Sequence, residues 1–233
     1  MATSGTVGQT RINTAKLLEK AIRRCGLSPA SLTAETWESS RETLFMFLMS
    51  LSSRGLNLWC VDHAIIPLVP GQATYQLPDG ALEVLNLLLS IPRGDGSYRD
   101  IEITPFNRDD YAGQPNKTFE SAQPTNYWFE KLIEPRITLW PVPNDSTRRL
   151  SLYYYRQPED VGSLTNELEI PSRWMEAVCW HLALRLAFEL PGVSAERLAL
   201  VQSMAQGMTV EVEGSETDSA PVYLAPNIRV YTR

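Results

Sequence analysis

The chain has 233 residues, 43% of them hydrophobic, and a formal net charge of −6 at pH 7. This composition supports a packed core and excludes a wholly disordered chain, while the acidic balance argues against a protein that grips DNA through its phosphates. The three cysteines lie far apart in the sequence, so we expect reduced thiols rather than a disulfide framework or a zinc site. The longest apolar stretches are too short to span a bilayer, and the first dozen residues lack the pattern of a signal peptide. We therefore expect a soluble protein, made in a cytoplasm, with no membrane partner.

Two helices are predicted near the N-terminus. Apolar residues recur at helical spacing from Thr14, the expected N-cap, to Cys25, and Gly26 supplies a C-terminal stop. A second helix is predicted over residues 33–54, before Gly55. Its apolar surface is wider than one face, which predicts that it packs on more than one neighbour in a bundle or an oligomer.

The pattern changes between residues 61 and 157. Prolines and glycines separate short runs rich in β-branched and aromatic residues, such as AIIPLV, RITLW and RLSLYYYR. This spacing is typical of an antiparallel sheet or a small sandwich. Within this region, the run TPFNRDDYAG predicts one or two helical turns, with Thr104 as the cap and Pro105 in the first position.

Helical spacing returns after Pro171, which is expected in a first turn, and it ends at Pro191-Gly192. Ser194 is expected to cap a further helix that reaches Met208. A connection this short predicts that the two helices form an antiparallel pair.

These elements predict an α+β fold with a helical bundle built from both chain ends. The bundle is assigned to residues 12–60 and 165–213, an inserted antiparallel β domain to 61–164, and an extended C-terminal arm to 214–233. The arm begins acidic and continues as PVYLAPNIRVYTR, which has too few residues to bury its own apolar groups, so a groove on a partner is the expected destination. The candidate partner-binding residues are Val222, Tyr223, Leu224, Ile228, Val230 and Tyr231.

The residues that could support catalysis form no recognisable pattern. His63 and His181 are the two histidines, and His181 lies in a dense apolar helix, where a packing role is expected. The sequence has no nucleophile elbow and no nucleotide-binding loop. Acidic pairs such as Glu167 and Glu169 leave open a glycosidase with two carboxylates, but acids in loops are ordinarily solvated surface. We therefore predict no enzyme, and no catalytic, cofactor-binding or metal-binding residues.

Aromatic residues are the most conspicuous feature of the β region. Tyr154 should face away from Tyr153 and Tyr155, because side chains alternate along a strand. An aromatic sheet face can stack on sugars or bases. Without a basic stripe beside it, we favour a sandwich core on one face and a subunit interface on the other.

Several segments, taken together and in order, resemble a known family. They are TAKLLEKAIRRCGL, GQATYQLPDGALEVLNLLL, QPTNYWFE, RITLWPVPN, LSLYYYRQP and EIPSRWMEAVCWHLALRLAFEL. The chain from Thr14 to Met208 resembles the head-to-tail adaptors of short-tailed bacteriophages, which are called tail tubular protein A or tail accessory factor. The resemblance implies a bundle from both chain ends with an inserted β domain.

The resemblance also implies a function and a set of partners. Members are virion structural proteins of the head–tail junction, assembled in the host cytoplasm as a ring, typically of twelve copies. The implied partners are other copies of the chain, the portal protein above, toward which the C-terminal segment reaches, and the tail nozzle or tail tube protein below. DNA would pass through the lumen without sequence-specific binding. Two alternatives stay open, a tail-associated peptidoglycan hydrolase and a carbohydrate-binding tail component.

Overall fold

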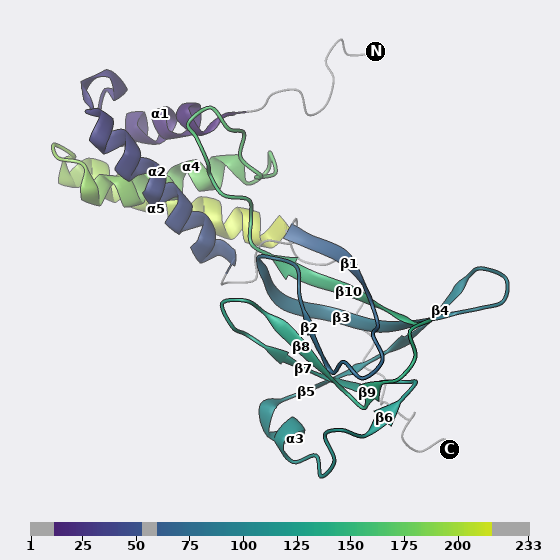
Figure 1. The fold of residues 1–233 in the computed structure, drawn as a ribbon. Helices are drawn as coiled ribbons and strands as arrows, with labels where there is room; N and C mark the ends of the chain where they lie inside the picture. The colour runs from purple at the N-terminus through teal and green to yellow at the C-terminus, as the bar shows by residue number, and fades with distance from the viewer. Residues whose placement is uncertain (1–11, 53–59, 216–233) are drawn as a thin grey trace.

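The computed structural model describes residues 12–52 and 60–215. Helices from both ends of the chain pack side by side at one end of the molecule, and the sheets formed by the middle of the chain lie at the other (Figure 1). The mixed α+β fold with an inserted β region is therefore confirmed.

Helix α4 is the centre of the bundle. The other three long helices pack on it, and α5 contacts it most extensively. The Cys25 thiol, just after α1, donates to the Ala183 carbonyl at 3.1 Å, and Arg24 forms an ion pair with Glu176 at 2.6 Å. The helices are α1 (Thr14–Arg24), α2 (Ala34–Ser52), α4 (Met175–Glu189) and α5 (Ala195–Ser215), with a short 3-10 helix at Pro29–Ser31 between the first two.

Helix α1 begins one residue earlier than predicted. Its N-cap is Asn13, whose side chain accepts the Lys16 N–H at 3.0 Å. Thr14 is instead the first helical residue, and its buried hydroxyl donates to the Asn166 carbonyl at 3.0 Å. Thr14 therefore fixes the helix to the segment that precedes α4, and its neighbour supplies the cap.

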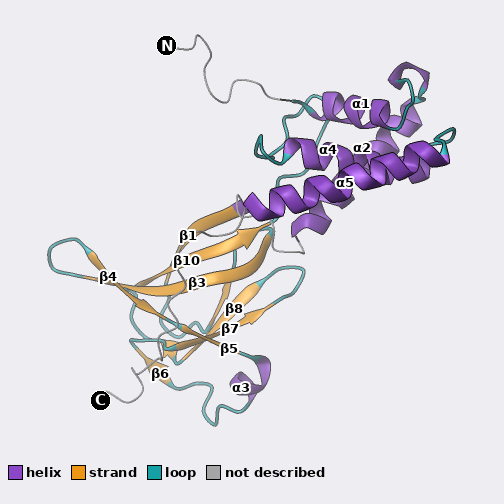
Figure 2. Ribbon diagram, turned by 180° about the vertical axis from the view of Figure 1, so that it is seen from behind, coloured by secondary structure: helices purple, strands orange, loops and turns teal. Residues whose placement is uncertain are grey.

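Helix α5 is longer than its sequence predicts. Ser194 caps it as expected, with its hydroxyl accepting an N–H of the first turn at 3.2 Å, but the helix ends at Ser215, seven residues beyond the predicted end. The Thr209 hydroxyl donates to the Ala205 carbonyl at 3.0 Å, and Val212 is buried against the bundle. Tertiary packing therefore overrides the weak helix propensity of this β-branched segment. Figure 2 shows the C-terminal end of α5 beside the start of β1.

The β region is a sandwich of two four-stranded sheets whose inner faces form its core. Fully buried leucines and isoleucines such as Leu89, Leu150 and Ile137 lie between the sheets. One sheet has the strand order β1 (Val61–Pro67), β10 (Arg149–Arg156), β3 (Ala81–Pro92), β4 (Tyr98–Glu102), and the other has β2 (Thr74–Gln76), β8 (Arg136–Trp140), β7 (Asn126–Glu130), β5 (Thr104–Phe106). A third, two-stranded sheet pairs β6 (Glu120–Ser121) with β9 (Val142–Pro143).

The prediction of a purely antiparallel β domain is wrong at two places. Strand β5 pairs with β7 in parallel, and β6 pairs with β9 in parallel. The connection between β5 and β7 is long enough to bring the chain back to the same end of the sheet, which parallel pairing requires. It contains α3 (Arg108–Ala112).

The predicted start of α3 is also wrong. Thr104 and Pro105 belong to β5, where the Thr104 N–H bonds to the Thr125 carbonyl at 2.9 Å. The cap is Asn107, which forms a capping box with Asp110. The box satisfies two backbone donors at once, so the helix begins where its polar residues can cap it.

The segment between β10 and α4 belongs largely to the helical half. Val161 is buried in the helical core, and Leu164 packs against it. Both residues fall in the range 61–164 that the sequence assigns to the β domain. They pack there because the segment runs along the bundle, with the Ala15 N–H bonded to the Leu164 carbonyl at 2.9 Å.

A charge at the centre of α4 should unfold the bundle. Leu182 is fully buried among the other helices, and an unpaired buried charge costs about 3 kcal/mol or more. We expect Leu182→Asp to give little soluble, cooperatively folding protein in chemical denaturation. The control is Met46→Asp on α2, where the side chain is 55% exposed and stability should be unchanged. Equal denaturation midpoints for Leu182→Asp and Met46→Asp would contradict the proposed packing of α4.

Candidate functional site

The two histidines lie in different halves of the molecule, and each is engaged in packing. The His181 ring stacks on Phe47 with centroids 5.5 Å apart, and its Nε2 atom is hydrogen-bonded to Thr209. The packing role predicted for His181 is confirmed. In the sandwich, His63 Nε2 lies 2.7 Å from the Ser151 hydroxyl.

Several acidic side chains of the described residues have structural partners. Asp110 caps α3, and Asp109 lies 3.6 Å from the guanidinium of Arg108. Glu169 accepts hydrogen bonds from Arg156. Within residues 12–52 and 60–215, no group of three or more His, Cys, Asp or Glu side chains is arranged to hold a metal ion.

The three cysteines are buried, and their thiols are poorly reactive. Burial raises the pKa of Cys25, Cys60 and Cys179 to about 11 each. The thiolate is the nucleophilic form, so these thiols are poor nucleophiles near neutral pH.

The tyrosine run alternates as predicted. Tyr154 is buried in the core between the sheets, whereas Tyr153 is exposed on the outer face and lies against His63, with ring centroids 4.6 Å apart. Tyr127, on β7, is likewise buried. The aromatic residues of β7 and β10 therefore contribute mainly to the core between the sheets, as predicted for one face of these strands.

An ion-pair cluster ties the sandwich to the bundle. Arg156, at the end of β10, donates to Glu169 on the segment that leads to α4, with one of the contacts at 2.9 Å. The Glu159 N–H donates to the same carboxylate at 3.1 Å, and Asp62 on β1 lies 3.5 Å from the guanidinium. The hydrogen bond from Arg156 lowers the pKa of Glu169 although partial burial works in the opposite direction.

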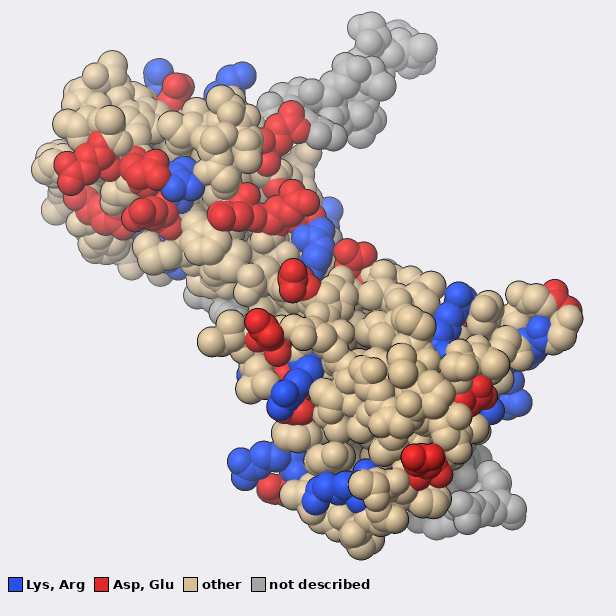
Figure 3. Space-filling view, in the orientation of Figure 1, with Lys and Arg blue, Asp and Glu red and all other residues tan. Residues whose placement is uncertain are grey.

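Acidic side chains gather on one face of the helical half. Figure 3 shows this face. Glu35, Glu38 and Glu42 on α2 and Glu189 at the end of α4 are exposed. A surface of this sign repels the phosphates of DNA.

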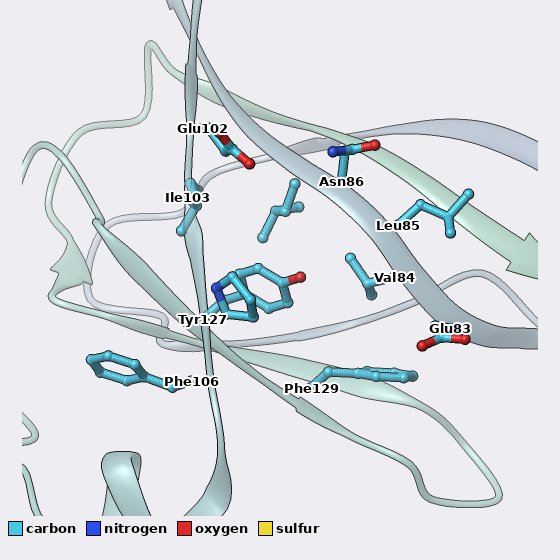
Figure 4. Close-up of a pocket in the computed structure, with 11 residues that line it drawn as sticks. Glu83, Val84, Leu85, Asn86, Glu102, Ile103, Phe106, Tyr127 and Phe129 are labelled. Atoms are coloured by element: carbon cyan, nitrogen blue, oxygen red, sulfur yellow. The ribbon is translucent and has the colours of Figure 1, made fainter. Parts of the chain in front are cut away.

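A pocket of about 360 Å³ opens at one edge of the sandwich. Figure 4 shows Tyr127 in it, flanked by Phe106 and Phe129, with the carboxylates Glu83 and Glu102 near its rim. The pKa of Tyr127 is raised, first by burial and then by these two carboxylates. No local sequence pattern predicts this pocket, because it lies between strands of two different sheets.

A second apolar feature lies at the tip of the β7–β8 hairpin. Ile133 is fully exposed and Leu132 more than half exposed. The sequence does contain an indication of this feature. Turns favour Gly, Asn, Asp and Ser, whereas the turn between β7 and β8 has the sequence KLIEP, with two aliphatic residues.

The predicted portal-binding residues lie outside the described part of the chain. The last described residue is Ser215, which ends α5, so only the first two residues of the predicted arm (214–233) are described, and both belong to the helix. The undescribed residues are Val222, Tyr223, Leu224, Ile228, Val230 and Tyr231. Among the described helices, none combines the length and the apolar character needed to cross a membrane.

In the described ranges, both histidines, the three cysteines, Asp110 and Glu169 take part in packing, hydrogen bonding, capping or ion pairing. The sequence matches the family described as "SU10 adaptor protein" over residues 17–225, and the chain belongs to this family. It is a phage head-to-tail adaptor, a non-enzymatic structural component of the virion at the head–tail junction.

No curated protein matches the chain. Among solved structures, the chain is similar to one from "Neck of empty GTA particle computed with C6 symmetry", with 13% identity over 87% of this chain and 93% of that chain and a TM-score of 0.30. A TM-score of this size does not establish a common fold.

Removing the carboxylate of Glu169 should weaken the junction and change its response to acid. Glu169→Gln loses charge-assisted hydrogen bonds worth about 1.5–3 kcal/mol. The folded pKa of Glu169 lies below its ordinary value of 4.5, so the stabilisation is present above pH 4.5 and is lost as the pH falls through the folded pKa. Urea titrations of the unmodified chain and the variant should therefore differ at pH 7 and converge in acid.

The control for this experiment is Glu35→Gln, which neutralises an exposed carboxylate on α2. We expect this variant to follow the unmodified chain at every pH. A constant difference between Glu169→Gln and the unmodified chain from pH 7 into acid would contradict the assigned role of the ion pair.

Proposed function

We propose that copies of this chain form a ring, typically of twelve, that joins the portal to the tail nozzle or tail tube. The observation that carries this proposal is the family match, which covers residues 17–225 and so includes both the bundle and the sandwich. An adaptor must surround the DNA exit, and a closed ring of identical copies does so with one repeated interface.

DNA passes through the lumen of this ring without sequence-specific binding. The net charge of −6 and the acidic face of the bundle support this part of the proposal. Basic side chains would hold the phosphates and release counterions, whereas an acidic wall leaves the DNA free to slide.

The C-terminal arm anchors the ring to the portal. Residues 221–233 read PVYLAPNIRVYTR, and their prolines favour an extended segment that suits strand addition or groove binding. The apolar residues Val222, Tyr223, Leu224, Ile228, Val230 and Tyr231 would enter portal grooves. Several arms binding together give avidity, so modest affinity per arm suffices.

Truncation after Ser215 should leave a folded protein that no longer binds portal assemblies. The cut keeps α5 whole, so the melting temperature should be unchanged while co-sedimentation with portal is lost. In the matched control, Glu216 and Asp218 are replaced by serine in the full chain, which leaves the apolar residues in place and should preserve binding. Undiminished binding of the truncated chain would place the joint on the helical domain instead.

The sandwich faces the tail side or the periphery of the ring. Its β3–β4 hairpin projects from the body of the molecule (Figure 1) and is closed by the Arg93 N–H bonded to the Ser97 carbonyl at 2.8 Å. Exposed loops vary without disturbing the elements that they connect, which suits a contact with a tail protein.

Shortening this hairpin should distinguish the joint to the portal from the joint to the tail protein. We expect deletion of residues 94–96, with Arg93 and Ser97 retained, to preserve portal binding and to reduce attachment of the tail protein or packing within the ring. Pull-down experiments in which one preparation of the variant captures portal protein or tail protein measure the two binding activities. Loss of portal binding alone would show that the faces are assigned the wrong way round.

A further inference from the structure

The sandwich carries an apolar projection and a pocket lined by both apolar and polar side chains, and both are exposed in the single copy. Ile133 at the β7–β8 tip is fully exposed. The pocket of about 360 Å³ lies on the open edge of the same sandwich, between β3 and the β5–β7 side. Two adjacent exposed aliphatic side chains and an open pocket on the same sandwich are candidate contact surfaces.

The hairpin tip is held rigidly. Glu130 and Arg136 close its base with an ion pair at 2.7 Å. The Leu77 N–H donates to the Pro135 carbonyl at 3.0 Å, and Gln76 donates to Glu134 at 3.3 Å. Because the tip is already ordered, little conformational entropy is lost when it enters a partner.

A β-bulge opens the pocket. Tyr153 pairs with Asn86 and Tyr154 with Val84, so Leu85 of β3 has no partner on β10. Bulges redirect side chains and bend strands, and Leu85 is exposed at the pocket. Strand β4 pairs only with the later half of β3, Leu88–Pro92, so the edge beside the pocket stays open.

The charges of the two features are opposite. The tip carries Lys131 directly before the two aliphatic residues. The rim of the pocket carries Glu83 and Glu102, and neither forms an ion pair within the described residues. A basic group beside an apolar tip therefore matches a pocket in which aliphatic and aromatic side chains lie beside two carboxylates.

We infer that the β7–β8 tip of one copy, with Leu132 and Ile133, enters the β3–β7 pocket of the next copy, and that Lys131 faces Glu83 or Glu102 there. This inference rests on the proposed ring and names its interface. A contact in which the tip of each copy enters the pocket of the next is heterologous, and it closes into a ring when the rotation permits. The pocket and the tip adjoin on β7, with the Lys131 Nζ atom 5.9 Å from the centre of the Phe129 ring, so a reciprocal two-fold contact would stop at dimers and would overturn the inference.

Cysteine cross-linking tests the contact directly. The native thiols are buried, so cysteines introduced by Ile133→Cys and Leu85→Cys react selectively with a short bismaleimide on portal-bound rings. We expect neither single variant to cross-link efficiently, their mixture to give covalent dimers, and the double variant to give a ladder up to the full ring. The matched control pairs Leu85→Cys with Phe188→Cys, an exposed position on α4, and should give no ladder.

Substitutions test the energetics of the same contact. Ile133→Asp should leave the melting temperature unchanged, because the side chain is exposed in the single copy, yet weaken ring formation about tenfold or more, as expected when an aliphatic side chain no longer fills a pocket. Lys131→Glu should also weaken rings, and adding Glu83→Lys and Glu102→Lys should restore them.

The outcomes separate this inference from the function on which it rests. Rings that form on portal without the cross-link ladder, or that tolerate Ile133→Asp, overturn the inference and leave the ring intact. Loss of tail-protein capture by Ile133→Asp rings that assemble normally assigns the tip to the tail joint and also overturns it. If the unmodified chain forms no ring on portal, both proposals fail together.

Discussion

The packing of α1, α2 and α5 around α4 is the contact on which the rest of the molecule depends. Side chains of α4 such as Val178, Leu182 and Leu186 are buried almost completely, although the four helices come from opposite ends of the chain. The bundle therefore closes only when residues 12–52 meet residues 159–215, and the sandwich between them is held as an insertion. The Arg156–Glu169 ion pair and the burial of Val161 extend this closure into the connecting segment. The consequence for an adaptor is a bundle and a sandwich that are bonded to each other through the segment between β10 and α4.

The separation of the chain into a helical bundle and a sandwich suits a protein that joins two different assemblies. The bundle presents the acidic face and the end of α5, while the sandwich presents the exposed tip of the β7–β8 hairpin and the projecting β3–β4 hairpin. Surfaces for different partners therefore lie on different units, and a change in one need not disturb the fold of the other. The proposed joints to portal, neighbour and tail each use one of these surfaces.

Much of the fold was predictable from local patterns, because apolar spacing and cap residues report on the backbone nearby. The helices, the Ser194 cap and the alternation of Tyr153 and Tyr154 were predicted correctly for this reason. The extension of α5 through Val212, the parallel β5–β7 pair and the Leu85 bulge were missed. Each depends on a partner distant in sequence, which local spacing cannot report. The candidate portal-binding residues remain a prediction from composition, since they lie outside the described residues.

A ring of this chain between portal and tail can be imaged by electron microscopy of the purified 233-residue chain mixed with portal assemblies. We expect rings of adaptor density at the narrow end of the portal, coaxial with the portal channel, that are absent when portal is imaged alone. Portal particles that stay bare at saturating adaptor, or that bind scattered single copies on their sides, would contradict it.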